Sequence, residues 1–225
     1  MKKGKRYRAS SEGVQAETVY ALDEGIKILK GFKKAKFDET VEVHVRLATS
    51  AKKIPQNITG KVSLPAGTGK DVRVTVIAKG DKAKEAAAAG ASRVGFEDII
   101  EEIKNGRIDF DVLITTPDCM KDVSHVARII GPKGLMPTPK AGSVTFEVGK
   151  AVESFKSGLV RWKVDSSGNI HAGCGKISFP DEGLVSNIKA LVGSIRAAKL
   201  PFISGEVIRK ITIATTMSPG IAVSV

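Results

Sequence analysis

The hydrophobic pattern of this chain changes twice along its length, and this change constrains the fold more than any single motif. Between residues 68 and 159, runs rich in β-branched residues, such as VRVTVIA at residues 72–78, alternate with segments of helical periodicity. Strands and helices that alternate at this spacing form βαβ units, in which helices cover a mostly parallel sheet on both faces. We therefore expect residues 68–159 to form an α/β domain, with helices near residues 81–89, 96–105, 118–130 and 148–155.

The segments on either side of this region follow a different pattern. Residues 40–47 alternate strictly between apolar and polar side chains, as in a strand with one buried and one exposed face. Residues 160–164 and 169–172 flank AspSerSerGly, a turn sequence that favours an antiparallel hairpin. Apolar residues at helical spacing predict amphipathic helices at residues 22–32 and beyond Pro180.

Helix and strand patterns of the same kind thus occur near both ends of the chain. We therefore expect residues 1–67 and 160–225 to fold together as one α+β terminal domain with an antiparallel sheet. Residues 68–159 would then be an inserted domain, joined to the terminal domain by two crossings.

Charge is distributed unevenly between these regions. The chain has 36 Lys and Arg against 24 Asp and Glu, a net charge of +12. Residues 68–159 contain 14 basic and 13 acidic residues, whereas the flanking segments together contain 22 and 11. Such a field attracts a phosphate backbone or an anionic membrane surface, although solubility alone is the alternative explanation.

Several other functional classes find little support in the sequence. No apolar run approaches the roughly 20 residues that span a bilayer, and no apolar signal region follows MKKGKRYR, so we expect a soluble cytoplasmic protein without a membrane partner. The separation of Cys119 and Cys174 favours reduced thiols over a disulfide or a metal site. Neither GTGK nor GPKG completes a phosphate-loop motif, and no neighbouring Ser, Cys or Asp motif places a nucleophile beside any of the histidines His44, His125 and His171. We expect no enzyme activity and no cofactor.

Residues 130–145, IGPKGLMPTPKAGSVT, form a segment rich in glycine, proline and lysine, a composition that excludes a regular helix or strand. The prolines and glycines form a shaped loop that would hold Lys133 and Lys140 in solvent, where they could meet an anion. A plain surface connection with solvated lysines explains the composition equally well.

Nucleic-acid binding is better supported at three other places. Lys36 and Phe37 combine a cation with a ring that could cover a sugar or a base edge. The polar side of residues 40–47 is exposed, which is also typical of an ordinary solvated sheet. The hydroxyls and methionine of residues 215–218 could bind ribose and phosphate, or could cap a turn and fill a core gap.

Aromatic residues make up only 5% of the chain, so recognition would rest on shape, backbone and 2′-hydroxyl contacts, which indicates folded RNA. The rival hypotheses are a metabolic enzyme that holds a phosphorylated ligand in the α/β domain and a general DNA-binding protein.

Five motifs occur in one order along nearly the whole chain: KFDETVEVHVRL, LPAGTGK, IGPKGLMPTPKAGSVT, VDSSGNIHAGCGKISFP and TTMSPG. In sequence and spacing they resemble the bacterial large-subunit ribosomal protein L1 family. The resemblance implies a terminal domain of split β-α-β type and an inserted, Rossmann-like three-layer domain. It also implies a monomer when free that binds large-subunit rRNA at the mobile stalk near the exit site, assists release of deacylated tRNA, and represses its own mRNA by binding a similar RNA fold.

The resemblance also assigns individual residues. Lys133 and Lys140, in the nearly neutral middle domain, become candidates for secondary contacts with stalk RNA or tRNA. The chain departs from the family pattern at Ser218, where many members have glycine, at Lys210 and at residues 48–56. The expected primary RNA surface lies on the basic terminal domain and comprises Lys36, Phe37, Thr40, His171, Gly175, Lys176, Thr215, Thr216, Met217 and Ser218.

Overall fold

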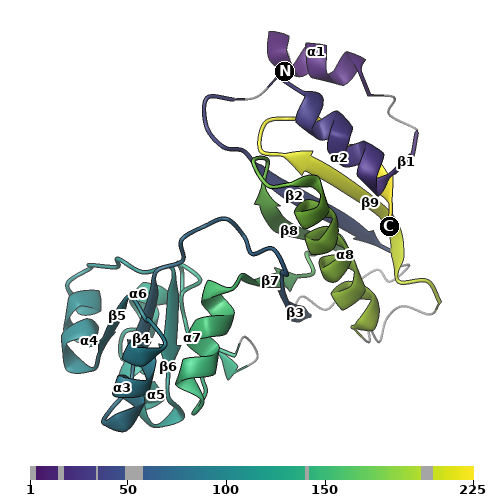
Figure 1. Ribbon diagram of the computed structural model, residues 1–225. Coiled ribbons are helices and arrows are strands. Elements are labelled where there is room, and N and C mark those ends of the chain that lie inside the picture. The colour runs from purple at the N-terminus through teal and green to yellow at the C-terminus, as the bar shows by residue number, and fades with distance from the viewer. Residues whose placement is uncertain (1–3, 15–17, 34, 49–57, 140–141, 199–204) are drawn as a thin grey trace. The chain divides into compact units, whose positions relative to one another are not determined.

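The computed structural model describes residues 4–14, 18–33, 35–48, 58–139, 142–198 and 205–225 (Figure 1). It divides into two compact units. Met1–Gly69 and Gly158–Val225 form the first, which we call the terminal unit, and Lys70–Ser157 form the second, the middle unit. Each unit is described by itself.

A five-stranded sheet is the centre of the terminal unit. Its order is β1-β10-β9-β2-β8, and its pairs are antiparallel except for the parallel pair of β1 and β10 at one edge. A separate antiparallel pair joins β3 to β7. The strands are β1 (Tyr20–Ala21), β2 (Thr40–Leu47), β3 (Thr59–Ser63), β7 (Leu159–Lys163), β8 (Asn169–Lys176), β9 (Ile208–Thr215) and β10 (Ile221–Ser224).

Two amphipathic helices cover one face of this sheet, α2 (Leu22–Gly31) and α8 (Asp181–Ala197) (Figure 1). Both occur where the apolar spacing predicts them. Their buried residues pack against the alternate apolar side chains of β2, so the polar side of β2 faces away from the helices. A third helix, α1 (Lys5–Glu12), precedes them and has no counterpart in the sequence-based expectation.

The hairpin predicted at AspSerSerGly forms only in part. The turn itself forms, because the Asp165 carboxylate accepts hydrogen bonds from the amides of Ser167 and Asn169. Beyond a single bridge between Val164 and Ile170, however, β7 pairs with β3 while β8 pairs with β2. Both strands find longer partners elsewhere, which local turn chemistry cannot indicate.

The middle unit has a parallel three-stranded sheet of order β5-β4-β6. Every residue of the central strand β4 is buried, as in a strand covered by helices on both faces. Helices α3 and α7 pack together, and α4 packs against α6. The elements are β4 (Val74–Ile77), α3 (Asp81–Ala88), β5 (Arg93–Gly95), α4 (Glu97–Lys104), β6 (Val112–Thr115), η1 (Pro117–Cys119), α5 (Met120–Ser124), α6 (Ala127–Ile130) and α7 (Val148–Lys156).

The helix expected at residues 118–130 is interrupted. A short 3₁₀ turn, α5 and α6 replace it, because the amides of His125 and Val126 bond to carbonyls only three residues earlier. The Ser124 hydroxyl donates to the Met120 carbonyl and so competes with the regular helix bonds. Cys119, Val123, Val126 and Ile130 are nevertheless all buried, so the helical spacing of these residues still marks the core.

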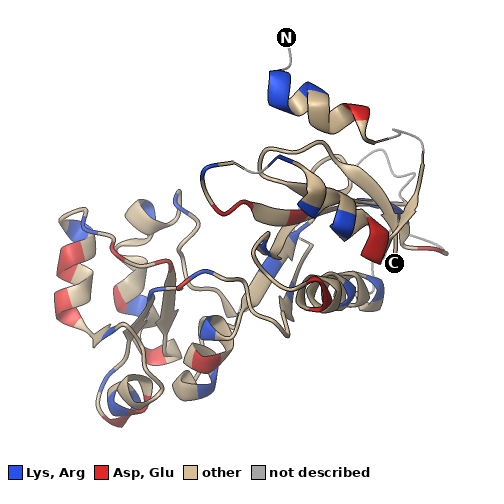
Figure 2. Ribbon diagram, turned by 45° about the horizontal axis from the view of Figure 1, so that its top comes forward, with Lys and Arg blue, Asp and Glu red and all other residues tan. Residues whose placement is uncertain are grey.

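Charges of both signs are interspersed along the ribbon of the middle unit (Figure 2). Within the described parts of the chain, no helix is long and apolar enough to cross a bilayer.

Candidate nucleic-acid interface

The ends of three neighbouring strands meet at one end of the five-stranded sheet. Thr40, the first residue of β2, lies opposite Lys176, the last residue of β8, and Val41 lies opposite Thr215, the last residue of β9. Residues 35–40 and the turn at residues 215–219 therefore lie side by side, although they are far apart in sequence. We call this end of the sheet the candidate interface.

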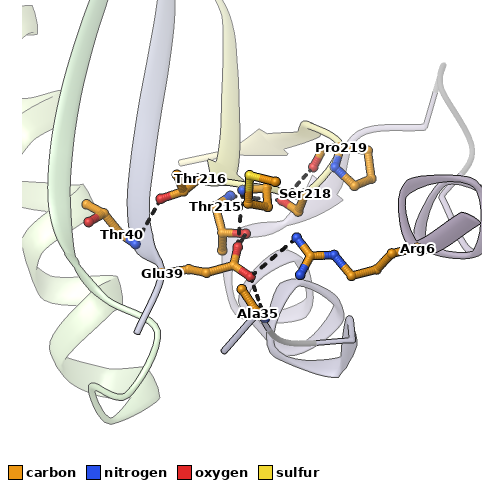
Figure 3. A network of polar contacts seen from close by, with 9 residues as sticks. Arg6, Ala35, Glu39, Thr40, Thr215, Thr216, Ser218 and Pro219 are labelled. Atoms are coloured by element: carbon orange, nitrogen blue, oxygen red, sulfur yellow. Dashed lines mark hydrogen bonds and ion pairs between the residues drawn. The ribbon is translucent and has the colours of Figure 1, made fainter. Parts of the chain in front are cut away.

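Glu39 joins these two segments (Figure 3). One of its carboxylate oxygens accepts a hydrogen bond from the Thr215 hydroxyl at 2.5 Å and another from the Met217 amide at 3.1 Å. The other oxygen accepts from the Ala35 amide at 2.9 Å and lies 3.9 Å from the Arg6 guanidinium. One buried carboxylate thus fixes the backbone on both sides of the candidate interface.

The charged form of Glu39 is stabilised where it lies. Burial, which leaves the residue only 5% exposed, would by itself raise the pKa of the carboxyl group. Hydrogen bonds from Thr215, Ala35 and Met217, together with the charge of Arg6, outweigh this effect and lower the pKa below its usual value. The carboxylate is therefore ionised at neutral pH and acts as a permanent acceptor.

Residues 215–219 form a turn with its own hydrogen bonds. The Ser218 hydroxyl accepts from the Thr215 amide at 2.8 Å and donates to the Pro219 carbonyl at 3.0 Å. The Thr216 hydroxyl accepts from the Thr40 amide, and the Thr216 amide donates to the Thr40 carbonyl, both at 3.2 Å. The Ser218 side chain therefore supports the turn, which leaves Thr216 and Met217 at its tip.

The side chains that this scaffold exposes are suited to a nucleic acid. Phe37 and Met217 expose 54% and 53% of their surfaces, unusual values for large apolar residues, while Lys36 and Thr216 are also exposed. A ring and a methionine can pack on sugars or bases, a lysine can pair with phosphate, and a hydroxyl can bond to a 2′-hydroxyl.

Two further expected residues lie at the same end but have mainly supporting contacts. The Lys176 ammonium donates to the Asp38 carbonyl at 3.2 Å and to the Thr40 hydroxyl at 3.1 Å. Gly175 is buried with a φ of +148°, and a Cβ there would lie 3.1 Å from the side chains of Leu184 and Phe179. A register shift between Val41 and Glu42 places a β-bulge in β8 just before Gly175, which explains this backbone shape.

His171 does not join the others. It lies opposite His44, four residues further along β2, on the helix-free face of the sheet. The Nδ1 atoms of the two rings are 2.8 Å apart, so one ring nitrogen donates a hydrogen bond to the other, and the His171 Nε2 lies 3.6 Å from the Asp165 carboxylate. At about 3.3 Å per residue, His171 is some 13 Å from Thr40 along the strand.

The glycine–proline loop belongs to the middle unit. Lys133 is exposed there, between Gly131 and Gly134, whose φ of +72° requires glycine. Lys140 lies outside the described residues, as does most of the unusual segment at residues 48–56.

Sequence reasoning missed Glu39 and α1. In the sequence, Glu39 is an ordinary acidic residue two positions after Phe37. Its role could not be predicted because its partners Thr215 and Met217 are 176 and 178 positions away. The basic run MKKGKRYR contains Arg6, but nothing in it indicates that Arg6 lies beside Glu39.

The cysteines and the possible metal-ligating side chains of the described residues bear on whether the chain holds a nucleophile or a metal site. Cys119 and Cys174 are buried free thiols, and burial raises the pKa of Cys174 to about 12, so this thiol is unreactive at neutral pH. In the described part of the chain, no three His, Cys, Asp or Glu side chains are grouped to hold a metal ion.

Comparison with known proteins places the sequence in a family. Residues 29–219 match the sequence model of the Ribosomal protein L1p/L10e family. The chain is also 46% identical over 224 residues to the large ribosomal subunit protein uL1 of Thermus thermophilus, covering 99% of this chain and 98% of that protein. The family model matches well over half of the chain and the relative covers nearly all of it, and the chain therefore belongs to the ribosomal protein L1p/L10e family.

Proposed function

We propose that this protein is a component of the large ribosomal subunit and binds folded rRNA through the candidate interface of its terminal unit. The observation that carries the proposal is the pair of exposed apolar side chains, Phe37 and Met217, held beside Lys36 by the buried Glu39 network. The name of the relative from Thermus supports the assignment to the large ribosomal subunit. The net positive charge of the flanking segments supports RNA binding by the terminal unit.

Binding would proceed by shape and backbone contacts. The Phe37 ring and the Met217 thioether would pack against ribose or an unstacked base, while Lys36 would pair with phosphate. The Thr216 hydroxyl would distinguish RNA from DNA by bonding to a 2′-hydroxyl. Because the segments are fixed before binding, little conformational entropy is lost on association.

The resemblance noted above extends the proposal. The rRNA site would be the mobile stalk near the exit site, where the protein would assist release of deacylated tRNA, with Lys133 and Lys140 as secondary contacts. A leader of its own mRNA with a similar fold would bind the same surface and be repressed. Since one surface serves both RNAs, the mRNA leader should compete with the rRNA for the protein.

The first prediction tests this interface directly. Met217→Asp places an anion against phosphate, so the affinity for a large-subunit rRNA stalk transcript should fall at least about a hundredfold, equivalent to about 2.7 kcal/mol. Filter binding in excess duplex DNA measures specific affinity, and thermal unfolding checks the fold.

Phe146→Asp is the matched control, because Phe146 is 57% exposed but belongs to the middle unit. It should bind like the unsubstituted protein. A folded Met217→Asp protein with normal affinity would exclude the candidate interface, and complete loss of binding in duplex DNA would favour a general DNA-binding protein.

A further inference from the structure

The opposite end of the five-stranded sheet has a second group of basic side chains. The pairing of β2 with β9 shifts register there: Arg46 lies opposite Lys210, but the next residue, Leu47, lies opposite Ile208. Arg209 is therefore the extra residue of a β-bulge. We call Arg46, Arg209 and Lys210 the bulge cluster.

The bulge changes where the cations point. In a regular strand, adjacent residues such as 209 and 210 alternate between faces, and one of them would enter the core. Here Arg209 and Lys210 are both exposed, between the buried Ile208 and Ile211, and both oppose the exposed Arg46. Three positive side chains are thus concentrated at one point of the sheet.

The bulge cluster has no ion-pair partner within the described residues. None of its three side chains lies within 4 Å of an Asp or Glu oxygen of a residue that the structure describes, and the neighbour of Arg46 on β8 is the neutral Asn169. Arg209 and Lys210 line a hollow together with Arg196 and Glu206, and Arg196 donates to the Val225 carbonyl at 2.9 Å. Like charges opposite one another destabilise a sheet, so this arrangement is best offset by a multivalent anion.

The sheet between the bulge cluster and the candidate interface forms one face. Thr40, Glu42, His44 and Arg46 alternate along β2 with the buried apolar residues, on the side away from α2 and α8. Glu42 is flanked by Gly173 on β8 and Ala214 on β9, two residues with little or no side chain. The strand carries Arg46 about 20 Å from Thr40, at about 3.3 Å per residue.

We propose that the bulge cluster binds phosphates of the same RNA that occupies the candidate interface, so that the RNA backbone extends along the helix-free face of the sheet. This inference rests on the proposed function. An RNA backbone supplies successive phosphates over this length of strand, whereas the polar side chains of Glu42, His44 and His171 between the two ends offer a lipid surface no apolar anchor.

The test compares two variants with the same loss of charge. In the first, Arg46→Gln, Arg209→Gln and Lys210→Gln are combined. In the control, Lys27→Gln, Lys163→Gln and Lys189→Gln remove three exposed lysines from α2, β7 and α8 of the same unit. Affinity for the large-subunit rRNA stalk transcript is measured between about 0.05 and 0.5 M salt for both variants and the unsubstituted protein.

Loss of three phosphate contacts should reduce the slope of log affinity against log salt by about 2 to 3, and the affinity near 0.1 M salt by at least about tenfold. The control should change the slope by less than one. Equal losses in both variants would show a general charge effect, and no loss in the first would show that the bulge cluster does not touch RNA. Either result overturns the inference.

Hydroxyl-radical footprinting separates this inference from the proposed function. The bulge-cluster variant should lose ribose protection at nucleotides that Met217→Asp still protects where it binds. If Met217→Asp weakens binding while the bulge-cluster variant binds and protects normally, only the inference fails. If the unsubstituted protein does not bind the transcript, the proposed function fails as well. If the bulge-cluster variant binds RNA normally but no longer binds polyglutamate, the bulge cluster binds an acidic protein instead of RNA.

Discussion

Glu39 is an acidic residue directly beneath a surface that we expect to bind phosphate. Its own charge repels RNA, but its hydrogen bonds to Thr215, Ala35 and Met217 hold the exposed residues in place. Arg6 offsets part of the repulsion from 3.9 Å away. Geometry and electrostatics therefore act in opposite directions at this residue, which makes it a useful position for substitution.

Glu39→Gln should weaken RNA binding even though it removes a negative charge. The amide group offers one acceptor oxygen and an NH2 group that only donates, in place of two acceptor oxygens, so one of the two segments loses its bond and the turn loosens. We expect a loss of about 1.5–3 kcal/mol in unfolding free energy, typical of hydrogen bonds to charged groups. Filter binding and urea titration measure the two effects.

Glu42→Gln is the control for this change, because Glu42 is half-buried in β2, three residues further along the chain, and its ion-pair contact within the described residues is with His44 at 3.9 Å. Its stability should change by less than about 0.5 kcal/mol. If Glu39→Gln bound RNA more tightly, electrostatic repulsion would outweigh positioning, and our account of this residue would be wrong.

His44 should make the stability of the terminal unit depend on pH. Burial, then the neighbouring His171, lower the pKa of His44 below its ordinary value of about 6.5, although Glu42 acts in the opposite direction. The unfolded chain then binds more protons than the folded one in this range. The contribution of the neutral His44 ring to stability is therefore fully present above about pH 6.5 and is lost as the pH falls from there through the folded pKa.

His44→Gln should flatten this profile, and His125→Gln, at an exposed position in the middle unit, should leave it unchanged. Urea unfolding at several values between about pH 5 and 8, the range in which histidine titrates, can be followed by fluorescence. The only tryptophan in the chain, Trp162, is buried in the terminal unit and reports on that unit alone. An equally steep profile in His44→Gln would assign the effect to other groups.

Among the elements, helix α2 packs unusually close to the sheet. A Cβ at Gly25 would lie 2.6 Å from the Val223 Cγ1 atom and 3.2 Å from the Ile213 Cδ1 atom. Glycine in a helix interior is about 1 kcal/mol less favourable than alanine. At Gly25 this cost is accompanied by closer packing of α2 against the sheet. Gly193 in α8 offers a comparison, since it is exposed and a Cβ there would have no neighbour within 4 Å.

Gly25→Ala and Gly193→Ala should therefore change stability in opposite directions. We expect Gly25→Ala to destabilise the terminal unit by about 1–2 kcal/mol, because overpacking exceeds the gain in propensity. Gly193→Ala should stabilise it by about 0.5–1 kcal/mol. Urea unfolding monitored through Trp162 provides both values, and stabilisation by Gly25→Ala would show that α2 can move away from β10.

The elements also differ in how well local sequence predicts them. Strand β2 and helix α8 follow their apolar periodicity closely, because each buries one face and exposes the other. The pairing of β7 with β3 and both bulges escaped prediction. A bulge depends on how two distant strands align, and neither strand alone records that alignment.

At the scale of the molecule, two chain segments leave the terminal unit beside one another. The Leu64 amide donates to the Gly158 carbonyl at 3.1 Å, and a Cβ at Gly158 would lie 2.7 Å from the Cα of Gly67. Asn187, fully buried in α8, accepts from the Ala66 amide and donates to the carbonyls of Gly67 and Cys174. The crossing segments are thus fixed by the terminal unit itself.

A chain in which Gly69 is joined directly to Gly158 should therefore fold and keep most of its specific RNA affinity. The two ends already lie close together, and the core of the terminal unit contains no residue of the middle unit. A loss above about 3 kcal/mol, roughly two hundredfold, would show that the middle unit supplies primary contacts. Filter binding measures the affinity, and the fluorescence of Trp162 reports whether the shortened chain folds.

The sequence by itself determined the type of most elements, the uneven charge and the family, because periodicity, composition and motifs are local properties of a chain. It also indicated Phe37 and Met217 as candidates from their chemistry. Only the tertiary structure decided that Glu39 holds these residues together, that His171 lies apart from them and that a bulge gathers Arg46, Arg209 and Lys210. Each of these depends on strand register between segments far apart in the chain, and register is set by the packing of the whole sheet rather than by either segment alone.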